Sequence, residues 1–182
     1  MPRLPARARS ALVRGGTHRV LFASSALGVA AADQAGKAWA VATRQGPAGQ
    51  DPATLVRNTG ASFGLGSRWT VVISLVTLAA VFVLVGAGWR ARGRAWVVAL
   101  ALMAGGAAGN GTDRLLRAPG PLRGAVVDWI TVPGYGPLFN LADVALRSGA
   151  VLALFLLLGH SGRHRAGPAR TADALRDPAS PR

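Results

Sequence analysis

The 182-residue chain contains no cysteine and no glutamate, and it has a single lysine. Without cysteine it has no disulfide bond, no thiolate metal site and no cysteine nucleophile. Its seven acidic residues are all aspartates and stand against 21 basic residues, which gives a formal net charge of +14. Charged residues make up only 15% of the chain, whereas about a quarter is usual in soluble domains. With 51% hydrophobic residues, this scarcity of charge argues against both an ordinary soluble domain and a disordered basic protein.

The hydrophobic residues concentrate in four long stretches. The clearest one covers residues 70–88, which carry no charge and are bracketed by Trp69 and Trp89, where interfacial aromatic residues anchor a membrane span. A second uncharged stretch covers residues 95–112. The first and last stretches are also long enough to cross a bilayer, although each contains one acidic and one basic residue, and they cover residues 20–43 and 138–159. The sequence therefore predicts an all-α integral membrane protein with four transmembrane helices.

Small residues in the third stretch indicate how the helices pack. Gly105 and Gly109 have the GxxxG spacing that lets two helices approach closely. Outside the helices, Leu55-Val56-Arg57 followed by Asn58-Thr59-Gly60 is typical of a short strand and a turn. The outer loops are therefore expected to add a small extracytoplasmic β element.

The distribution of arginine predicts the orientation of the four helices. Eleven of the fourteen surplus charges fall in residues 1–19, 90–94 and 160–182, and the connections 44–69 and 113–137 hold the other three. The positive-inside tendency then places both termini in the cytoplasm. A nucleic-acid binder is excluded, because the arginines flank the spans instead of forming one basic face. The predicted organisation is a basic cytoplasmic N-terminus over 1–19, a four-helix transmembrane domain over 20–159 and a disordered basic cytoplasmic tail over 160–182.

The N-terminus also admits a second interpretation. The early arginines, the apolar run from Val20 and the Ala30-Ala31-Ala32 sequence resemble a cleaved secretory signal. Two observations argue against it: the apolar segment resumes after Lys37, and cleavage would leave an odd number of spans with a worse charge distribution.

Ionisable residues inside a membrane are costly, so each one is a candidate functional residue. Asp33 and Lys37 lie four residues apart, which puts them on one helix face within reach of a salt bridge. Structural support for the first helix is the favoured interpretation of this pair, and a direct chemical role is the alternative.

Asp128 and Asp143 are the candidates for chemistry. Asp128 ends a β-branched segment and Asp143 opens the last helix, so both are expected at the outer edge of the bilayer. Two carboxylates that converge share one proton, and such a pair can act as general base and general acid on one water molecule. The alternative is that Asp128 is a solvated loop residue and that Asp143 caps its helix or pairs with Arg147. A Ser-His or metal-dependent protease is not expected, because the three histidines lie outside the spans on the inner side: His18, His160 and His164.

Five short sequence blocks follow one another between residues 33 and 143 and contain the candidate residues discussed above. They are Asp33-Gln34-Ala35-Gly36-Lys37, Asn58-Thr59-Gly60-Ala61-Ser62-Phe63-Gly64, Gly109-Asn110-Gly111-Thr112-Asp113-Arg114, Val126-Val127-Asp128-Trp129-Ile130 and Phe139-Asn140-Leu141-Ala142-Asp143. With these blocks on four spans, the sequence resembles the lipoprotein signal peptidases, or signal peptidase II, which are intramembrane aspartic peptidases of bacteria.

The resemblance implies an activity and a set of site residues. Asp128 and Asp143 would be the catalytic pair, which activates water to cleave a signal peptide just before a diacylglyceryl-modified cysteine. Seven polar residues would bind substrate or support the site: Asp33, Lys37, Asn58, Asn110, Asp113, Arg114 and Asn140. No metal or cofactor is expected, and the expected partners are lipid-modified prolipoproteins and membrane lipids, with no nucleic acid. The protein would be a monomer in the bacterial cytoplasmic membrane, with its active site near the outer face.

Several features depart from the family pattern or leave alternatives. Gly36 stands where the family commonly has threonine, and Gly111-Thr112 replaces more apolar residues, which is expected to loosen packing near Asn110. The residues themselves suggest a helix-end ion pair between Asp113 and Arg114. Arg147 is outside the motif and would reach lipid headgroups or bias the proton of the aspartate pair. The rival function is a small transporter or proton relay that uses Asp33, Lys37, Asp143 and Arg147.

Overall fold

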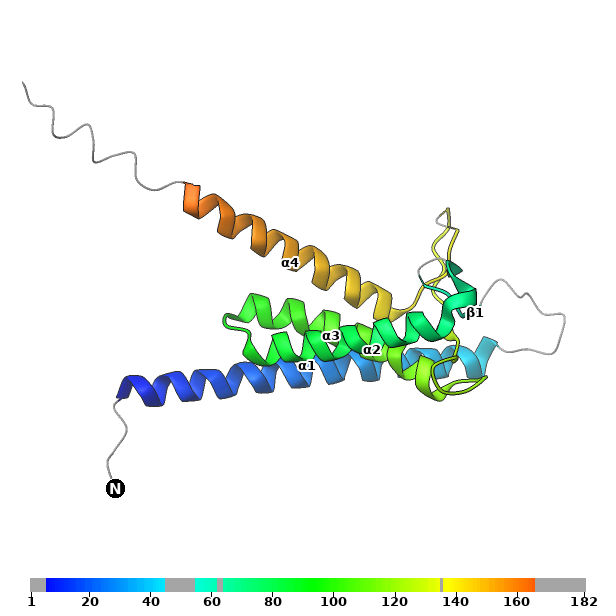
Figure 1. The fold of residues 1–182 in the computed structure, drawn as a ribbon, viewed down its shortest axis with the longest axis horizontal. Coiled ribbons are helices and arrows are strands. Elements are labelled where there is room, and N and C mark those ends of the chain that lie inside the picture. Colours follow the sequence, from blue (N-terminus) through cyan, green and yellow to red (C-terminus); the bar gives the residue numbers. More distant parts are fainter. Residues whose placement is uncertain (1–5, 45–54, 62–63, 135, 166–182) are drawn as a thin grey trace, which may run out of the picture.

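The computed structural model describes residues 6–44, 55–61, 64–134 and 136–165, and most of them are helical (Figure 1). The elements in chain order are α1 (Ala6–Arg44), β1 (Val56–Asn58), the 3₁₀ helix η3 (Ser67–Trp69), α2 (Thr70–Arg90), α3 (Arg94–Leu116), β2 (Val126–Asp128) and α4 (Leu141–Arg165). The predicted helical protein with a small β element is confirmed at this level.

Within the described part of the chain, three helical segments are long and apolar enough to cross a membrane. They are Ser67–Arg90, Arg94–Leu116 and Leu141–Gly159. Helix α1 is longer, at 39 residues, but it is not among them, because Asp33, Gln34 and Lys37 reduce the hydropathy of its apolar half. The fourth span and the cytoplasmic position of both termini therefore stay predictions.

The helical backbone extends beyond the predicted boundaries at both ends. Helix α1 begins at Ala6, well before the expected start at Val20, and α4 continues to Arg165. Residues 166–182 of the predicted disordered tail lie outside the described residues.

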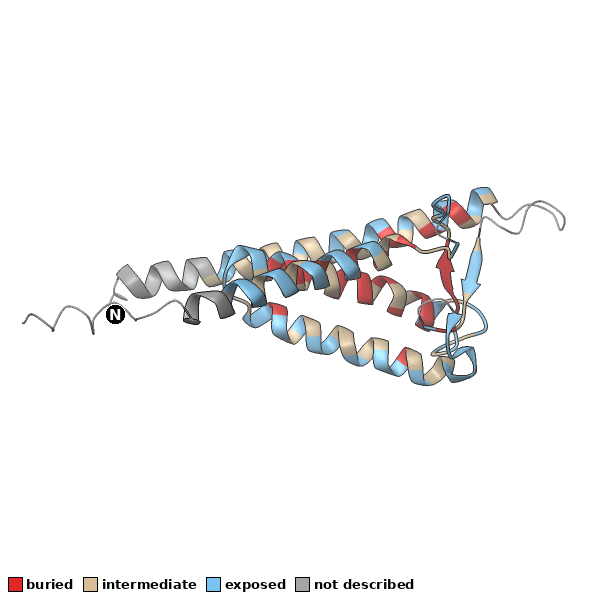
Figure 2. Ribbon diagram, turned by 90° about the horizontal axis from the view of Figure 1, so that it is seen from above, coloured by how far each residue is buried: buried red, intermediate tan, exposed pale blue. Residues whose placement is uncertain are grey.

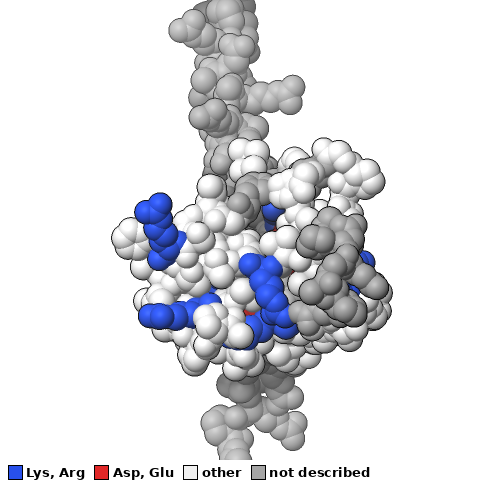
Figure 3. Space-filling model, turned by 90° about the vertical axis from the view of Figure 1, so that its right-hand side faces the viewer, with Lys and Arg blue, Asp and Glu red and all other residues white. Residues whose placement is uncertain are grey.

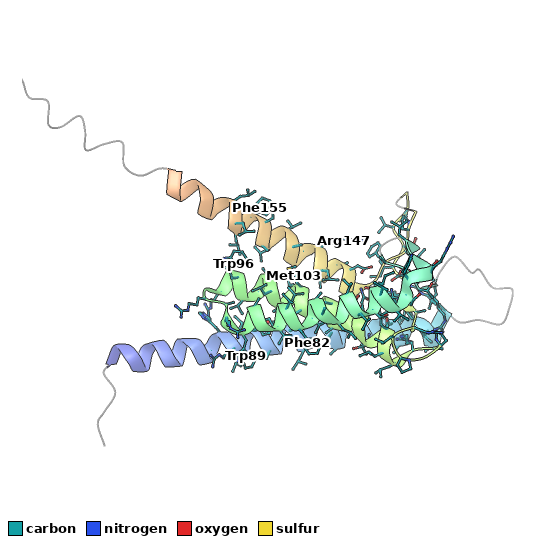
Figure 4. All side chains as sticks on the ribbon, in the orientation of Figure 1. Phe82, Trp89, Trp96, Met103, Arg147 and Phe155 are labelled. Atoms are coloured by element: carbon teal, nitrogen blue, oxygen red, sulfur yellow. The ribbon has the colours of Figure 1, made fainter. Side chains whose placement is uncertain are left out.

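Helix α3 is the centre of the bundle and packs against each of the other three helices. Figure 1 shows α1, α2 and α3 running along one another, while α4 diverges from them towards the end opposite the sheet. Buried residues gather on α3 and near the sheet, and the outer helix faces are exposed (Figure 2). Large apolar side chains cover those faces: Phe82 is 77% exposed and Phe155 68%, and Figure 4 shows Phe155 on the side of α4 turned away from the bundle. Such apolar outer faces fit contact with lipid.

The predicted GxxxG face of α3 is confirmed as a packing face. A Cβ atom at Gly105 would lie 2.5 Å from the carbonyl oxygen of Ala26 on α1, and one at Gly109 would lie 2.6 Å from an oxygen of Asp33. Gly106 has a similar role towards α4, because its Cβ would lie 2.5 Å from the carbonyl oxygen of Ala142. The glycines let α1 and α4 approach α3 closely enough for the polar contacts described below.

This packing predicts opposite effects for two glycine substitutions on α3. We expect Gly105→Ala to lower the free energy of unfolding by roughly 1–3 kcal/mol, because the added methyl group meets backbone that cannot move aside. Gly111→Ala is the matched control, because its Cβ would meet only side-chain atoms at ordinary contact distances, the nearest being Cδ2 of Leu78 at 3.5 Å. Alanine also favours the helix by about 0.5–1 kcal/mol. Thermal unfolding in detergent should therefore separate the two variants, and equal stability would contradict the proposed contact.

The small sheet is antiparallel and joins the two segments between the helices. Val56 pairs with Asp128, Arg57 with Val127 and Asn58 with Val126. An isolated bridge between Ile130 and Phe139 then returns the chain to the start of α4. The predicted strand around residue 56 and the extended segment at residue 128 are thus confirmed.

Candidate active site

A cavity of about 380 Å³ lies between α2, α3, α4 and the sheet. Ile73, Val76 and Ala80 of α2 form part of its apolar wall. Its polar lining consists of Asn58, Thr77, Asn110, Arg114, Asp128, Asp143 and Arg147. The tertiary structure therefore brings Asp128 and Asp143 to the wall of one cavity, although they belong to a strand and a helix.

Asp128 ends β2 and is only 4% exposed. The amide Nδ2 of Asn140 donates to its Oδ1 at 2.7 Å, and Nδ2 of Asn58 donates to its Oδ2 at 3.1 Å. The interpretation of Asp128 as a solvated loop residue is therefore wrong. Burial raises the pKa of Asp128 to about 6, and the nearby charge of Asp143 adds to this effect, whereas the hydrogen bonds from Asn58 and Asn140 oppose it.

Asp143 lies in the first turn of α4. Its Oδ1 accepts a hydrogen bond from Nδ2 of Asn110 at 3.1 Å, and its backbone N–H donates to Oδ1 of Asn140 at 3.0 Å. Asn140 thus caps α4 with its oxygen and holds Asp128 with its nitrogen. Among the described residues Asp143 forms no ion pair with Arg147, so that alternative is wrong as well.

A buried ionic network lies behind Asn110. The ammonium group of Lys37 is 2.7 Å from Asp33 and 2.8 Å from Asp113, and all three side chains are fully buried. The same Nζ donates to Oδ1 of Asn110 at 2.9 Å. Because this bond fixes the oxygen of the Asn110 amide towards Lys37, its nitrogen is turned towards Asp143. The predicted pair of Asp33 and Lys37 is confirmed, and it is linked to the site through one asparagine.

The two carboxylates of this network also bind backbone groups of the site. Oδ1 of Asp33 accepts the N–H of Ala142 at 2.9 Å, in the first turn of α4. Oδ2 of Asp113 accepts the N–H of Val127 at 3.2 Å, next to Asp128 in β2. The network therefore fixes the backbone next to Asp143 and next to Asp128.

The expected ion pair between Asp113 and Arg114 is wrong. Consecutive residues of a helix point in different directions, and Asp113 pairs instead with Lys37 and with Arg117, the latter at 2.6 Å. Arg114 is 4% exposed, and its guanidinium group donates to backbone carbonyl groups, which belong to Asn58, Thr59, Gly60 and Gly124. Arg114 thus fixes the turn after β1, including the backbone of the residue that holds Asp128.

Gln34 is a supporting residue that the sequence analysis missed. Its Nε2 donates to the carbonyl oxygen of Gly109 at 2.9 Å and to Oδ1 of Asp113 at 3.2 Å. The signal for it was present, because Gln34 is a polar residue next to Asp33 in an apolar stretch. Uncharged polar residues inside a predicted span warrant the same attention as charged ones.

The unusual glycine at position 36 makes room for a tryptophan. A Cβ atom at Gly36 would lie 2.9 Å from Cζ2 of Trp129. Trp129 packs edge to face with Trp39 at a centroid separation of 5.5 Å, and the guanidinium group of Arg44 lies over both rings. Glycine at position 36, where the family commonly has threonine, therefore leaves space for the cluster of Trp39, Trp129 and Arg44.

Asp128 also reaches a second cavity, of about 380 Å³, on the loop side of β1. Asn58, Asp128 and Leu138 line both cavities. Figure 3 views this end of the molecule and shows basic side chains around it with very little acidic surface. Arg147 is exposed on the wall of the first cavity, and Figure 4 places it on α4 towards the sheet end. Asp128 is thus nearly hidden from solvent and lines two adjoining cavities, whereas Asp143 is partly exposed and lines only the first.

Comparison with known proteins identifies the family. The family model for signal peptidase (SPase) II, Peptidase_A8, matches residues 25–159. The chain belongs to the signal peptidase II family. The matched range includes every supporting residue discussed above. Membership of this family identifies the chain as a peptidase of signal-peptide processing.

Individual relatives agree with this membership. The lipoprotein signal peptidase of Mycobacterium avium is 42% identical over 127 residues, which is 68% of this chain and 68% of that protein. The lipoprotein signal peptidase of Mycobacterium tuberculosis is 45% identical over 106 residues, which is 57% of this chain and 50% of that protein. The match thus covers 68% of the first of these relatives and half of the second.

Solved structures show the same fold. A bacterial membrane enzyme determined by the in meso method at 2.3 Å resolution superposes with a TM-score of 0.63 at 28% identity, covering 85% of this chain and 95% of that one. A second bacterial membrane enzyme, determined by the same method at 1.9 Å resolution, superposes with a TM-score of 0.58 at 30% identity. This match covers 79% of this chain and 93% of that one.

Proposed function

We propose that this signal peptidase II homologue removes signal peptides from prolipoproteins by cleaving before a diacylglyceryl-modified cysteine, and that Asp128 and Asp143 activate the attacking water. One observation carries the proposal. Two aspartates from different elements line one cavity, and three asparagine amides hold them in place. The family membership supplies the reaction class.

The environments of the two aspartates suggest different roles. Because burial raises the pKa of Asp128 to about 6, we assign the shared proton to Asp128. Asp143 would then take a proton from water, whose oxygen attacks the carbonyl carbon of the scissile bond. Asp128 would give its proton to the carbonyl oxygen in the same step. Collapse of the tetrahedral intermediate breaks the C–N bond, and the proton held by Asp143 passes to the leaving nitrogen. Asp128 takes back a proton from a hydroxyl group of the intermediate, which leaves the carboxylic acid product and restores the starting protonation of the pair.

The cavities suggest a path for the substrate. The first cavity has apolar residues of α2 on one wall, so it suits the signal helix and the acyl chains of the modified cysteine. The second cavity lies on the loop side of Asp128 and suits the polar chain that follows. We further propose that α1 is the fourth span and that both termini face the cytoplasm, which places the sheet and the aspartates near the outer face. A lipidated cysteine is held by its acyl chains at that depth.

Dependence on substrate lipidation tests the proposed function. The full chain, reconstituted in vesicles, is expected to cleave a diacylglyceryl-modified prolipoprotein, with mass spectrometry showing the modified cysteine as the new N-terminal residue. The same precursor without the lipid is the matched control and is expected to stay intact. Equal cleavage of both precursors, or cleavage at another bond, would contradict the proposed specificity.

The pH dependence of catalysis tests the role of Asp128. Above about pH 6, Asp128 loses its proton and the pair has no acid left, so kcat/KM is expected to fall about tenfold per pH unit. The hydrogen bond from Asn58 stabilises the charged carboxylate, and its removal in Asn58→Ala raises the pKa of Asp128. The falling limb should therefore move to higher pH in this variant. A limb that stays in place or moves to lower pH would exclude Asp128 as the proton donor.

A further inference from the structure

A third cavity lies at the end of the molecule opposite the aspartates. Its volume is about 630 Å³, and it forms where α1 passes the connection between α2 and α3. Figure 1 shows this connection and the sheet at opposite ends of the bundle, and Figure 4 labels Trp89 near the connection. The proposed peptidase reaction uses none of the residues that line this cavity.

The lining is strongly basic. Arg19 of α1, Arg90 at the end of α2 and Arg92 of the connection contribute three guanidinium groups, and His18 adds an imidazole. Arg19 stacks over the ring of Trp89 at 5.9 Å, and Nη1 of Arg90 donates to the carbonyl oxygen of Gly86 at 3.0 Å. The ion pairs found in the described part of the chain do not include any of these arginines. The positive charge of the cavity is therefore not neutralised by a described carboxylate.

The position of the cavity indicates which anion it suits. Trp89 ends an apolar span and is half-exposed, as expected of a side chain at the level of lipid headgroups. Exposed apolar residues continue from the cavity along both helices, with Val20 on α1 and Val85 on α2. Guanidinium groups bind phosphate through several N–H donors at once, and basic pockets between transmembrane helices bind lipid headgroups.

We propose that this cavity binds the phosphate group of an anionic phospholipid, whose acyl chains lie along the exposed faces of α1 and α2. A zwitterionic headgroup is disfavoured, because its choline cation would meet the same arginines. Binding of a free phosphate ester has the same polar chemistry but does not use the apolar faces.

The proposal is tested on the full chain in detergent by native mass spectrometry with dioleoyl phosphatidylglycerol. We expect this lipid to bind more tightly than dioleoyl phosphatidylcholine. The double variant Arg19→Gln/Arg92→Gln is expected to weaken the binding of phosphatidylglycerol by roughly 30-fold, because it removes two exposed arginines that each attract the phosphate by about 1 kcal/mol. The matched control is Arg68→Gln/Arg123→Gln, which removes the same charge from exposed positions at the sheet end.

Each other outcome would overturn the proposal. An equal loss of affinity in both double variants would show that net charge, and not this cavity, attracts the lipid. Unchanged affinity in Arg19→Gln/Arg92→Gln would remove the site altogether. Free glycerol phosphate is the third arm: if it binds as tightly as the lipid, the site is one for a soluble phosphate ester. Because the readout is lipid binding, failure of the peptidase proposal does not affect the result.

Discussion

Asp128→Asn and Asp143→Asn are each expected to lower the rate of signal-peptide release at least about 10³-fold, from the loss of one proton-transferring group. Asparagine keeps the size of the side chain and an acceptor oxygen, but it neither takes a proton from water nor gives one to the carbonyl oxygen. The measurement is single-turnover cleavage of a lipidated prolipoprotein by the reconstituted enzyme.

The control must separate lost chemistry from lost structure. Arg147→Gln changes a polar residue on the same cavity wall, one turn along α4 from Asp143, and we expect it to change the rate less than tenfold. Thermal unfolding should show that both aspartate variants remain folded and inserted in the membrane. Turnover at the normal rate in either of them would exclude the aspartate pair as the catalytic groups.

The second large effect is expected on stability. Lys37→Met should lower the free energy of unfolding by about 3–5 kcal/mol, because the carboxylates of Asp33 and Asp113 would remain buried without their shared cation. Thermal unfolding and the yield of folded protein measure this loss. The cleavage rate per folded enzyme molecule should fall less than the yield of folded protein, since Lys37 contacts Asn110 and not the aspartates of the cavity.

Two further variants test this explanation. Arg117→Gln removes the other cation of Asp113 but should cost much less, because Arg117 is partly exposed and Lys37 remains in place. Combining Lys37→Met with Asp33→Asn and Asp113→Asn should restore much of the stability, since the buried charges are removed and asparagine still accepts the backbone N–H groups. A Lys37→Met variant that is stable but inactive would instead place the lysine in the reaction.

Local patterns were sufficient to predict several elements. The strand at Val56 and the turn at Gly60 were predicted from β-branched and turn-forming residues that act over a few positions. The close packing of α3 was predicted from the spacing of Gly105 and Gly109. The pairing of Asp33 with Lys37 was predicted because residues four apart share a helix face. Each of these predictions rests on residues that lie a few positions apart in the sequence.

The predictions that failed concern partners distant in sequence. Arg114 was paired with its neighbour, whereas its carbonyl partners lie up to 56 residues away. Gln34 stands beside Asp33 in the sequence, but one of its acceptors, Asp113, is 79 residues away. No local rule identifies such partners, because they are decided by which helix faces the close packing around α3 brings together.

The sequence by itself determined the helical class, the apolar stretches, the family and the two candidate aspartates, because composition, periodicity and motif blocks are properties of the chain. Only the tertiary structure decided what surrounds those aspartates. It placed Asp128 and Asp143 on one cavity, oriented Asn140 between them and connected Lys37 to Asp143 through Asn110. The physical reason is that the directions of hydrogen bonds and the burial that raises the pKa of Asp128 arise only when separate segments pack together.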